Sequence, residues 1–196
     1  MATTTKLSIC NGALQKIGVP RIASIDEASK EGRICNSEFD KARRAVLRMY
    51  HWSFATKRVV LSPLVNVPAF EYEYTFELPS DCLRVLSLFE YYDTHRVEGL
   101  HILANSDTLN LVYTADVEDF TQIDDLFVDA LEWFLGYTIA RYLTESETTR
   151  QEALQGFKSI MPLAKFVQST EHSQPVLEAD DLLLARNGRF VRDPGT

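Results

Sequence analysis

The sequence has few of the residues on which many common sites depend. Its 196 residues include only 3 cysteines and 8 glycines. Cys10, Cys35 and Cys82 are widely spaced and form no Cys-x-x-Cys pair, which argues against a zinc site or a disulfide framework. The glycines are scattered, without a dinucleotide-binding or P-loop pattern. The sequence therefore does not indicate a nucleotide-dependent enzyme of either class.

Long apolar runs are missing as well. The longest stretch without a charged residue, residues 59–70, has 12 residues and contains Pro63 and Pro68. A membrane-spanning helix needs about 20 apolar residues. The first ten residues also lack the charged-then-apolar pattern of a secretory signal. We therefore expect a soluble protein that is made in the cytosol and has no membrane partner.

Positive charge becomes scarce after the first third of the chain. Residues 1–60 carry 11 Lys and Arg against 5 Asp and Glu, whereas residues 61–122 carry 2 against 11 and residues 123–196 carry 7 against 12. The formal net charge of -8 argues against a protein that reads DNA sequence, because phosphate binding needs clustered Lys and Arg. The asymmetry instead supplies complementary surfaces, within one chain or between neighbouring copies.

Hydrophobic periodicity predicts two helices near each end of the sequence. Apolar residues recur at intervals of three and four over residues 5–18, 29–50, 123–143 and 153–167, and residues 144–147 have capping-box spacing before the last of these helices. The third of these helices is apolar around most of its circumference, so we expect it at the centre of a bundle. Pro162 should kink or interrupt the last helix, because it lacks a backbone N–H.

Between the two helix pairs the pattern becomes that of strands. Alternating or β-branched segments, separated by turn residues, lie at residues 52–61, 70–77, 83–89, 95–97, 100–103 and 108–114. Such closely spaced strands predict a small antiparallel sheet or barrel. The expected fold class is α+β: an antiparallel bundle of about four helices with an inserted small antiparallel β domain and an extended C-terminal arm. The bounds would be 1–51 and 122–170 for the two halves of the helical layer, 52–121 for the β domain and 171–196 for the arm.

One group of acidic residues could hold a divalent cation for hydrolysis. It comprises Asp116, Glu118, Asp119, Asp124, Asp125 and Asp129, at a strand-to-helix junction. Asp124 and Asp125, however, fall in the first turn of a helix, where carboxylates complement the helix dipole. No His or Lys pairs with the group by sequence. We favour helix capping and predict no enzymatic activity, catalytic residue, metal or cofactor, with a metal-dependent hydrolase using residues 116–129 as an alternative.

A basic run occupies the second helix and the strand after it. On the helix it consists of Arg33, Lys41, Arg43, Arg44 and Arg48, and it continues with Lys57 and Arg58. One interpretation is a solvated face with pairs such as Glu38 to Lys41 and Asp40 to Arg44. The other is a positive stripe that faces a DNA backbone or an acidic neighbouring subunit. A DNA-binding module using the helix at residues 29–50 is therefore a second alternative, although the run has no interleaved aromatic residues for stacking on single strands.

Seven sets of short fragments between residues 7 and 144 follow one another in a distinctive order. They are Leu7–Gly18; Ala42–Ala55, with the pattern ARxxxL…WxFA; Tyr72–Tyr74; Leu78–Val85; Val97–Gly99 with Ile102–Asn105; Leu111–Tyr113; and Asp125–Leu131 followed by Ala140–Thr144. Taken together, the fragments resemble the tail tubular protein A, or head-to-tail adaptor (connector), family of short-tailed bacteriophages.

This resemblance implies a non-enzymatic virion protein of the phage tail, at the portal-tail junction and made in the host bacterial cytoplasm. Members of the family form a homo-oligomeric ring, expected to be dodecameric, between the portal protein and a tail nozzle of the tail tubular protein B type. Double-stranded DNA passes through the channel during ejection without sequence recognition. The basic stripe would then face the channel or the next subunit. Docking onto the portal or a neighbour would use residues of the arm: Leu182, Leu183, Leu184, Arg186, Arg189 and Phe190.

Overall fold

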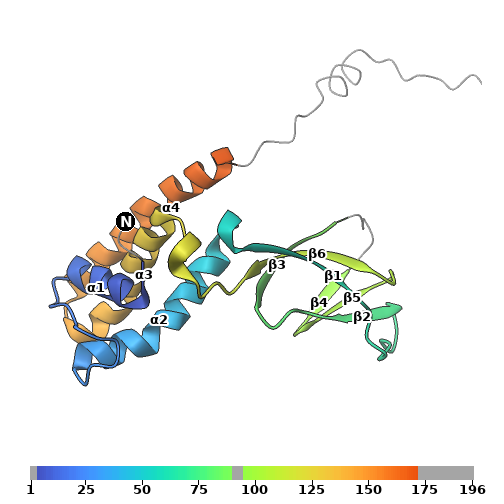
Figure 1. Cartoon of the computed structure of the whole chain (residues 1–196), viewed down its shortest axis with the longest axis horizontal. Coiled ribbons are helices and arrows are strands. Elements are labelled where there is room, and N and C mark those ends of the chain that lie inside the picture. Colours follow the sequence, from blue (N-terminus) through green and yellow to red (C-terminus); the bar gives the residue numbers. More distant parts are fainter. Residues whose placement is uncertain (1–3, 90–94, 172–196) are drawn as a thin grey trace, which may run out of the picture.

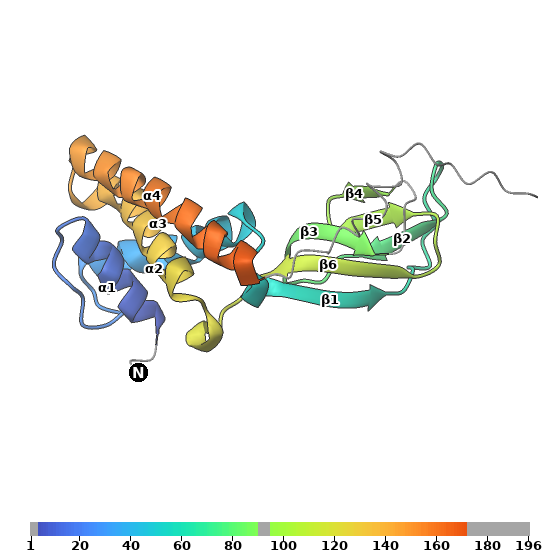
Figure 2. The same ribbon diagram turned by 90° about the horizontal axis from the view of Figure 1, so that it is seen from above.

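The computed structural model describes residues 4–89 and 95–171, and these form two parts (Figure 1). Four helices pack together in one part, and two three-stranded antiparallel sheets form the other. Seen from above, the two parts lie end to end, so the described molecule is elongated (Figure 2). The expected α+β class is therefore confirmed. Residues 172–196, nearly all of the expected C-terminal arm, lie outside the described residues.

The predicted helices are confirmed, each to within about one turn at either end. They are α1 (Lys6–Lys16), α2 (Lys30–Met49), α3 (Asp125–Leu143) and α4 (Glu147–Glu171). The side chains of Thr5, Ser29 and Asp124 cap the first three helices by accepting backbone N–H groups of the first turn. None of the described helices is long and apolar enough to cross a membrane.

α3 lies at the centre of the helical part, as its apolar circumference predicts, and it packs against the other three helices. Phe127, Leu131 and Leu135 on this helix are fully buried. Gly136 allows α1 to come close, because a Cβ atom there would lie 3.3 Å from the carbonyl oxygen of Ala13. The residues of α3 thus form the middle of the larger hydrophobic core.

α4 continues through Pro162, so the helix is not interrupted there. The proline removes one backbone N–H, which leaves the carbonyl oxygen of Lys158 without its usual donor. Pro162 and Lys158 both lie on the exposed side of α4. Water can therefore satisfy that carbonyl oxygen, and the helix tolerates the proline.

Trp52 holds the chain at the point where it leaves the helical part. Its side chain is fully buried, and its ring centroid lies 4.9 Å from that of Phe127 in an edge-on contact. Its Nε1 donates a hydrogen bond of 3.1 Å to the carbonyl oxygen of Val46. The strand predicted from residue 52 is therefore wrong at its start: Trp52 belongs to the helical core, and a 3-10 turn, η1 (Ser53–Ala55), follows it.

The six strands form two sheets that pack face to face. The first sheet has the order β1 (Thr56–Leu61), β6 (Leu109–Ala115), β3 (Cys82–Phe89), and the second has the order β2 (Tyr74–Glu77), β5 (His101–Ala104), β4 (Arg96–Glu98). Phe76 and Ile102 from the second sheet are buried against Leu109 and Leu111 from the first. The result is a small two-sheet sandwich, where the sequence predicted a single sheet or a barrel.

The strand predicted over residues 70–77 is shorter than its alternating pattern suggests. Only Tyr74–Glu77 forms β2. Glu71 has a φ of 73°, and a strand cannot continue through this left-handed conformation. The side chain of Phe70 is 79% exposed, whereas Phe76 lies opposite Ile102 in β5. Only the second half of the aromatic pattern therefore has a partner strand.

Candidate interaction surfaces

The predicted basic stripe on α2 is not one continuous surface. Four of its five side chains are exposed: Arg33, Lys41, Arg44 and Arg48. The fifth, Arg43, is only 1% exposed. Neighbouring residues on a helix point about 100° apart, which lets Arg43 turn inward while Arg44 faces solvent. The surface open to DNA or to a neighbouring subunit therefore lacks Arg43.

Arg43 joins α2 to the segment that leaves the β part. Its Nη1 donates a hydrogen bond of 2.9 Å to the carbonyl oxygen of Val117. Its Nη2 lies 3.0 Å from Oδ1 of Asp116, 3.3 Å from Oε1 of Glu118 and 3.6 Å from Oδ1 of Asp40. A buried guanidinium is tolerated only when its charge and its N–H groups are compensated. Arg43 and the first acidic residues of the junction therefore form one ion-pair network, which extends from the buried guanidinium to the exposed carboxylates of Glu118 and Asp40.

Of the two ion pairs predicted on the surface of α2, the structure contains one. Lys41 pairs with Glu38 at 2.8 Å, as the helical spacing predicts. Arg44, however, pairs through Nε with Oδ2 of Asp116 at 2.9 Å, and Asp40 pairs with Arg43 in its place. The predicted Asp40 to Arg44 pair is therefore wrong, because the carboxylate of Asp116 approaches Arg44 from outside the helix.

The acidic residues at the strand-to-helix junction have separate structural roles. Asp124 caps α3, which confirms the predicted capping, and Asp129 pairs with Lys16 of α1. Asp119 accepts hydrogen bonds from the backbone N–H and the hydroxyl of Thr121, and these bonds lower the pKa of Asp119. Across residues 4–89 and 95–171, no three His, Cys, Asp or Glu side chains are grouped as a metal ion would require.

Asp81 links the three strands of the first sheet near the helical part. It precedes β3, and its carboxylate lies 2.6 Å from Nζ of Lys57 in β1 and accepts a 3.0 Å hydrogen bond from the hydroxyl of Tyr113 in β6. Burial alone would raise the pKa of Asp81, but the bonds from Lys57 and Tyr113 outweigh it and lower that pKa. Burial, together with the nearby Asp81 carboxylate, raises the pKa of Tyr113 to about 12.

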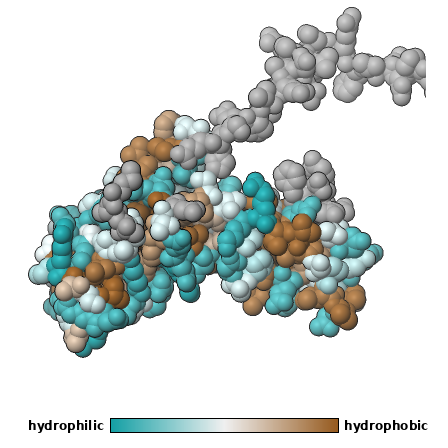
Figure 3. Space-filling view, in the orientation of Figure 1, coloured by the Kyte–Doolittle hydropathy of each residue, from teal (hydrophilic) through white to brown (hydrophobic). Residues whose placement is uncertain are grey.

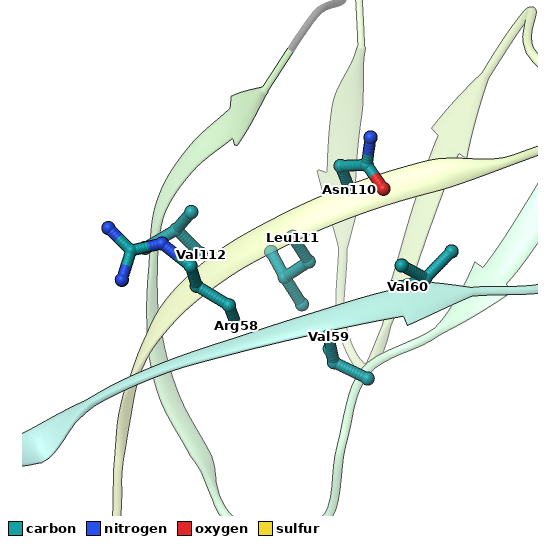
Figure 4. Close-up of a pocket in the computed structure, with 6 residues that line it drawn as sticks. All are labelled: Arg58, Val59, Val60, Asn110, Leu111 and Val112. Atoms are coloured by element: carbon teal, nitrogen blue, oxygen red, sulfur yellow. The ribbon is translucent and has the colours of Figure 1, made fainter.

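A shallow hollow lies on the first sheet, between β1 and β6 (Figure 4). Its volume is about 370 Å³, and it is lined by Arg58, Val59, Val60, Asn110, Leu111 and Val112. Successive side chains of a strand point to opposite faces. Because Leu109 and Leu111 pack against the second sheet, Asn110 and Val112 face outward. We call this feature the outer hollow. The only sequence signal for it is the adjacent pair Val59 and Val60, which interrupts the alternation of β1.

Arg84 lies on the same face of the sheet as Arg58, which lines the outer hollow. Arg84 in β3 is opposite Thr114, and Arg58 in β1 is opposite Val112, so both arginines stand on the outward face of the sheet. Nη1 of Arg84 donates a 3.3 Å hydrogen bond to the carbonyl oxygen of Arg48, in the last turn of α2, where carbonyls lack helical donors. Among the described residues, no carboxylate lies within 4.0 Å of the guanidinium groups of Arg48, Arg58 or Arg84. Arg84 stands among acidic residues in the sequence, so no basic run points to it.

Apolar side chains are exposed on both parts of the molecule. In the loop between β1 and β2, Val65, Val67 and Phe70 are 99%, 70% and 79% exposed, and we call them the apolar tip. On α4, Leu163 and Phe166 are 50% and 66% exposed, and we call them the α4 stripe. Figure 3 shows apolar surface on the β part and toward the C-terminal end of α4. These two surfaces are the clearest candidates for contacts with other proteins.

The docking residues predicted in the arm lie outside the described residues. They are Leu182, Leu183, Leu184, Arg186, Arg189 and Phe190. Their predicted contacts with a portal or a neighbouring copy therefore stay a prediction.

Comparison with known proteins does not assign the chain to a family. No family model matches the sequence, and no curated protein matches it significantly. The resemblance to head-to-tail adaptors thus rests on the ordered fragments between residues 7 and 144.

Proposed function

We propose that the protein is the head-to-tail adaptor of a short-tailed bacteriophage, a structural virion protein at the portal-tail junction. Copies of the chain form a ring, dodecameric by the resemblance, between the portal protein and the tail nozzle. Double-stranded DNA passes through the channel of this ring without sequence recognition. The proposal is supported by the ordered fragments over residues 7–144 and by the distribution of exposed apolar side chains.

The observation that carries the proposal is the presence of exposed apolar surfaces on two different parts of one molecule. The apolar tip belongs to the β part, and the α4 stripe belongs to the helical part. Exposed apolar clusters usually mark contacts with other proteins. Because the two surfaces differ in residues and position, they favour head-to-tail contacts, in which one face of a copy meets a different face of the next. Contacts of this kind generate closed rings when the rotation between copies is suitable.

The charge distribution agrees with such contacts. Part of the basic first third is used inside the chain, where Arg43 and Arg44 pair with Asp116. Arg48 remains exposed and has no carboxylate partner among the described residues, which leaves it available to an acidic face of the next copy. The overall charge of -8 suits a channel that lets a polyanion slide past, because tight phosphate binding needs an excess of positive charge.

Electron microscopy of the full chain tests the proposal, alone and mixed with the portal protein encoded in the same genome. We expect rings, or portals capped by rings. The double variant Leu163→Asp/Phe166→Asp should remain folded, because both side chains are already exposed, but it should form fewer rings because charge disrupts an apolar contact. Gln155→Asp, on the exposed side of the same helix, is the matched control. A wild-type chain that stays monomeric at every concentration, with and without portal, contradicts the proposal.

A further inference from the structure

The outer hollow is apolar at its centre and basic along one side. Val60, the last residue but one of β1, is 64% exposed and lies diagonally across from Val112 on the same outward face. The side chain of Arg58 extends past Val112, and Val60 lies further along β1 (Figure 4). Arg84 stands on this face across β6. The surface therefore combines apolar side chains with two guanidinium groups that have no carboxylate partner among the described residues.

This combination fits a short peptide in which acidic residues stand next to apolar ones. Guanidinium groups bind carboxylates through charge-assisted, often bidentate hydrogen bonds. Exposed valines gain free energy when another apolar side chain removes them from water. A peptide with only one of these features would leave either the arginines unpaired or the valines exposed.

The chain itself contains such a segment. Residues 178–184 read Glu-Ala-Asp-Asp-Leu-Leu-Leu, with three acidic residues, no basic residue and three consecutive leucines. They belong to the 25 residues that follow Glu171, the last residue that the structure describes. The arginines of that stretch come only later, from Arg186 onward. The segment therefore matches the outer hollow in both charge and hydrophobicity.

The segment can reach the outer hollow of its own molecule. Near the end of α4, Oε1 of Gln168 accepts hydrogen bonds from the backbone N–H and the hydroxyl of Ser53, at 2.9 and 2.8 Å. Ser53 comes five residues before Arg58, so the two lie at most about 17 Å apart, the length that five residues span at the rise of a strand. The seven residues from Glu171 to Glu178 span up to about 23 Å when extended. The length of the intervening chain therefore permits an intramolecular contact.

We infer that residues 178–184 dock on the outer hollow of the same chain. Asp180 and Asp181 face Arg58 and Arg84, and the leucines that follow cover Val60. The α4 stripe is closer in sequence, but it offers neither a hollow nor an unpaired guanidinium group. The inference does not depend on ring formation, because it concerns one isolated molecule. It assigns an occupant to a described hollow where exposed valines lie beside two guanidinium groups that have no carboxylate partner among the described residues.

Hydrogen–deuterium exchange of the full chain tests this inference, with a synthetic peptide of residues 176–186 as the reference. We expect the amides of residues 178–184 to exchange about tenfold more slowly in the protein than in the peptide. Arg58→Glu should abolish that protection. Combining it with Arg84→Glu and Asp180→Arg/Asp181→Arg should restore the protection, because the charges are then exchanged between the two sides.

Arg33→Glu is the matched control, since Arg33 is also exposed but lies on α2, away from the outer hollow. Circular dichroism of each variant checks that the fold is kept, as expected for substitutions of exposed arginines. The inference is overturned if residues 178–184 exchange as fast in the protein as in the peptide, or if Arg33→Glu and Arg58→Glu have equal effects. Protection that grows with protein concentration also overturns it, because the segment would then bind a second copy. Protection that survives Arg58→Glu and is lost in Phe166→Asp overturns it too, because the segment would then contact the α4 stripe.

Discussion

The buried guanidinium of Arg43 donates a hydrogen bond of 2.9 Å to the carbonyl oxygen of Val117, 74 residues further along the chain. Arg43 belongs to α2, and Val117 lies just after β6, where the chain returns from the β part. Hydrogen bonds with a charged donor are directional and relatively strong. This contact therefore helps to fix the orientation of the β part relative to the helices.

Replacing Arg43 with Ala should lower the free energy of unfolding by about 3 kcal/mol, because the change leaves acidic groups near the core without their buried partner. Urea denaturation followed by circular dichroism measures this change. Arg44→Ala is the control: its side chain is 54% exposed and pairs with Asp116 at the surface, so we expect a loss of less than about 1 kcal/mol. Equal losses for the two variants would show that the Arg43 network has no special role.

Acid should weaken the protein partly through Asp81. The bonds from Lys57 and Tyr113 hold the pKa of Asp81 below its ordinary value of 3.8, despite the opposing effect of burial. The carboxylate of Asp81 thus binds a proton less readily in the folded state than in the unfolded state. The stabilisation is complete above about pH 4, and it is lost as the pH falls through the lower folded pKa. Asp81→Asn should therefore flatten the pH dependence of the unfolding free energy below pH 4, as measured by urea denaturation at a series of pH values.

Trp52 should be among the most sensitive positions of the helical core. Trp52→Ala removes a fully buried side chain and its hydrogen bond to Val46, so we expect a loss of about 3–5 kcal/mol in unfolding free energy. Trp52→Phe keeps an aromatic ring and should lose less. Phe166→Ala, at a side chain that is 66% exposed, serves as the control and should change stability by less than about 0.5 kcal/mol. Thermal unfolding of the three variants decides whether this order holds.

Duplex DNA should bind the isolated chain weakly. Arg43 is buried and the net charge is -8, so the exposed arginines do not form a long positive face. We expect a Kd above about 10 µM at physiological salt, measured by fluorescence anisotropy with a labelled duplex. At low salt, the triple variant Arg48→Ala/Arg58→Ala/Arg84→Ala should bind more weakly than the wild type. Submicromolar, sequence-dependent binding at physiological salt would favour the alternative of a DNA-binding module.

The helices could be predicted closely because their signals are local. The apolar spacing of residues 29–50 corresponds to α2 at Lys30–Met49, and Asp124 caps α3 as its position before an apolar run suggests. Strands depend more on distant partners. The alternation over residues 70–77 therefore overstated β2, since the pairing with β5 begins only at Tyr74.

The candidate surfaces were harder to predict, because they combine distant residues. The periodicity of α2 placed Arg43 beside the basic stripe, but its burial depends on the segment around Val117, on the far side of the β part. Arg84 gave no sequence signal, yet the register of β3 brings it onto the same face as Arg58. The exposure of Phe70 likewise follows from the left-handed backbone at Glu71, which an alternating pattern does not indicate.

The β part begins and ends at the same place. Thr56, the first residue of β1, is paired in register with Thr114, near the end of β6. Paired residues of antiparallel strands lie only about 5 Å apart. A few glycines could therefore join the two chain ends if the β part were deleted, and the helices would still follow one another in an unchanged order. Trp52 and Asp124 lie outside the deleted residues and remain in the helical part. The paired positions Thr56 and Thr114 thus mark a natural site for exchanging one β part for another while the helical part is kept.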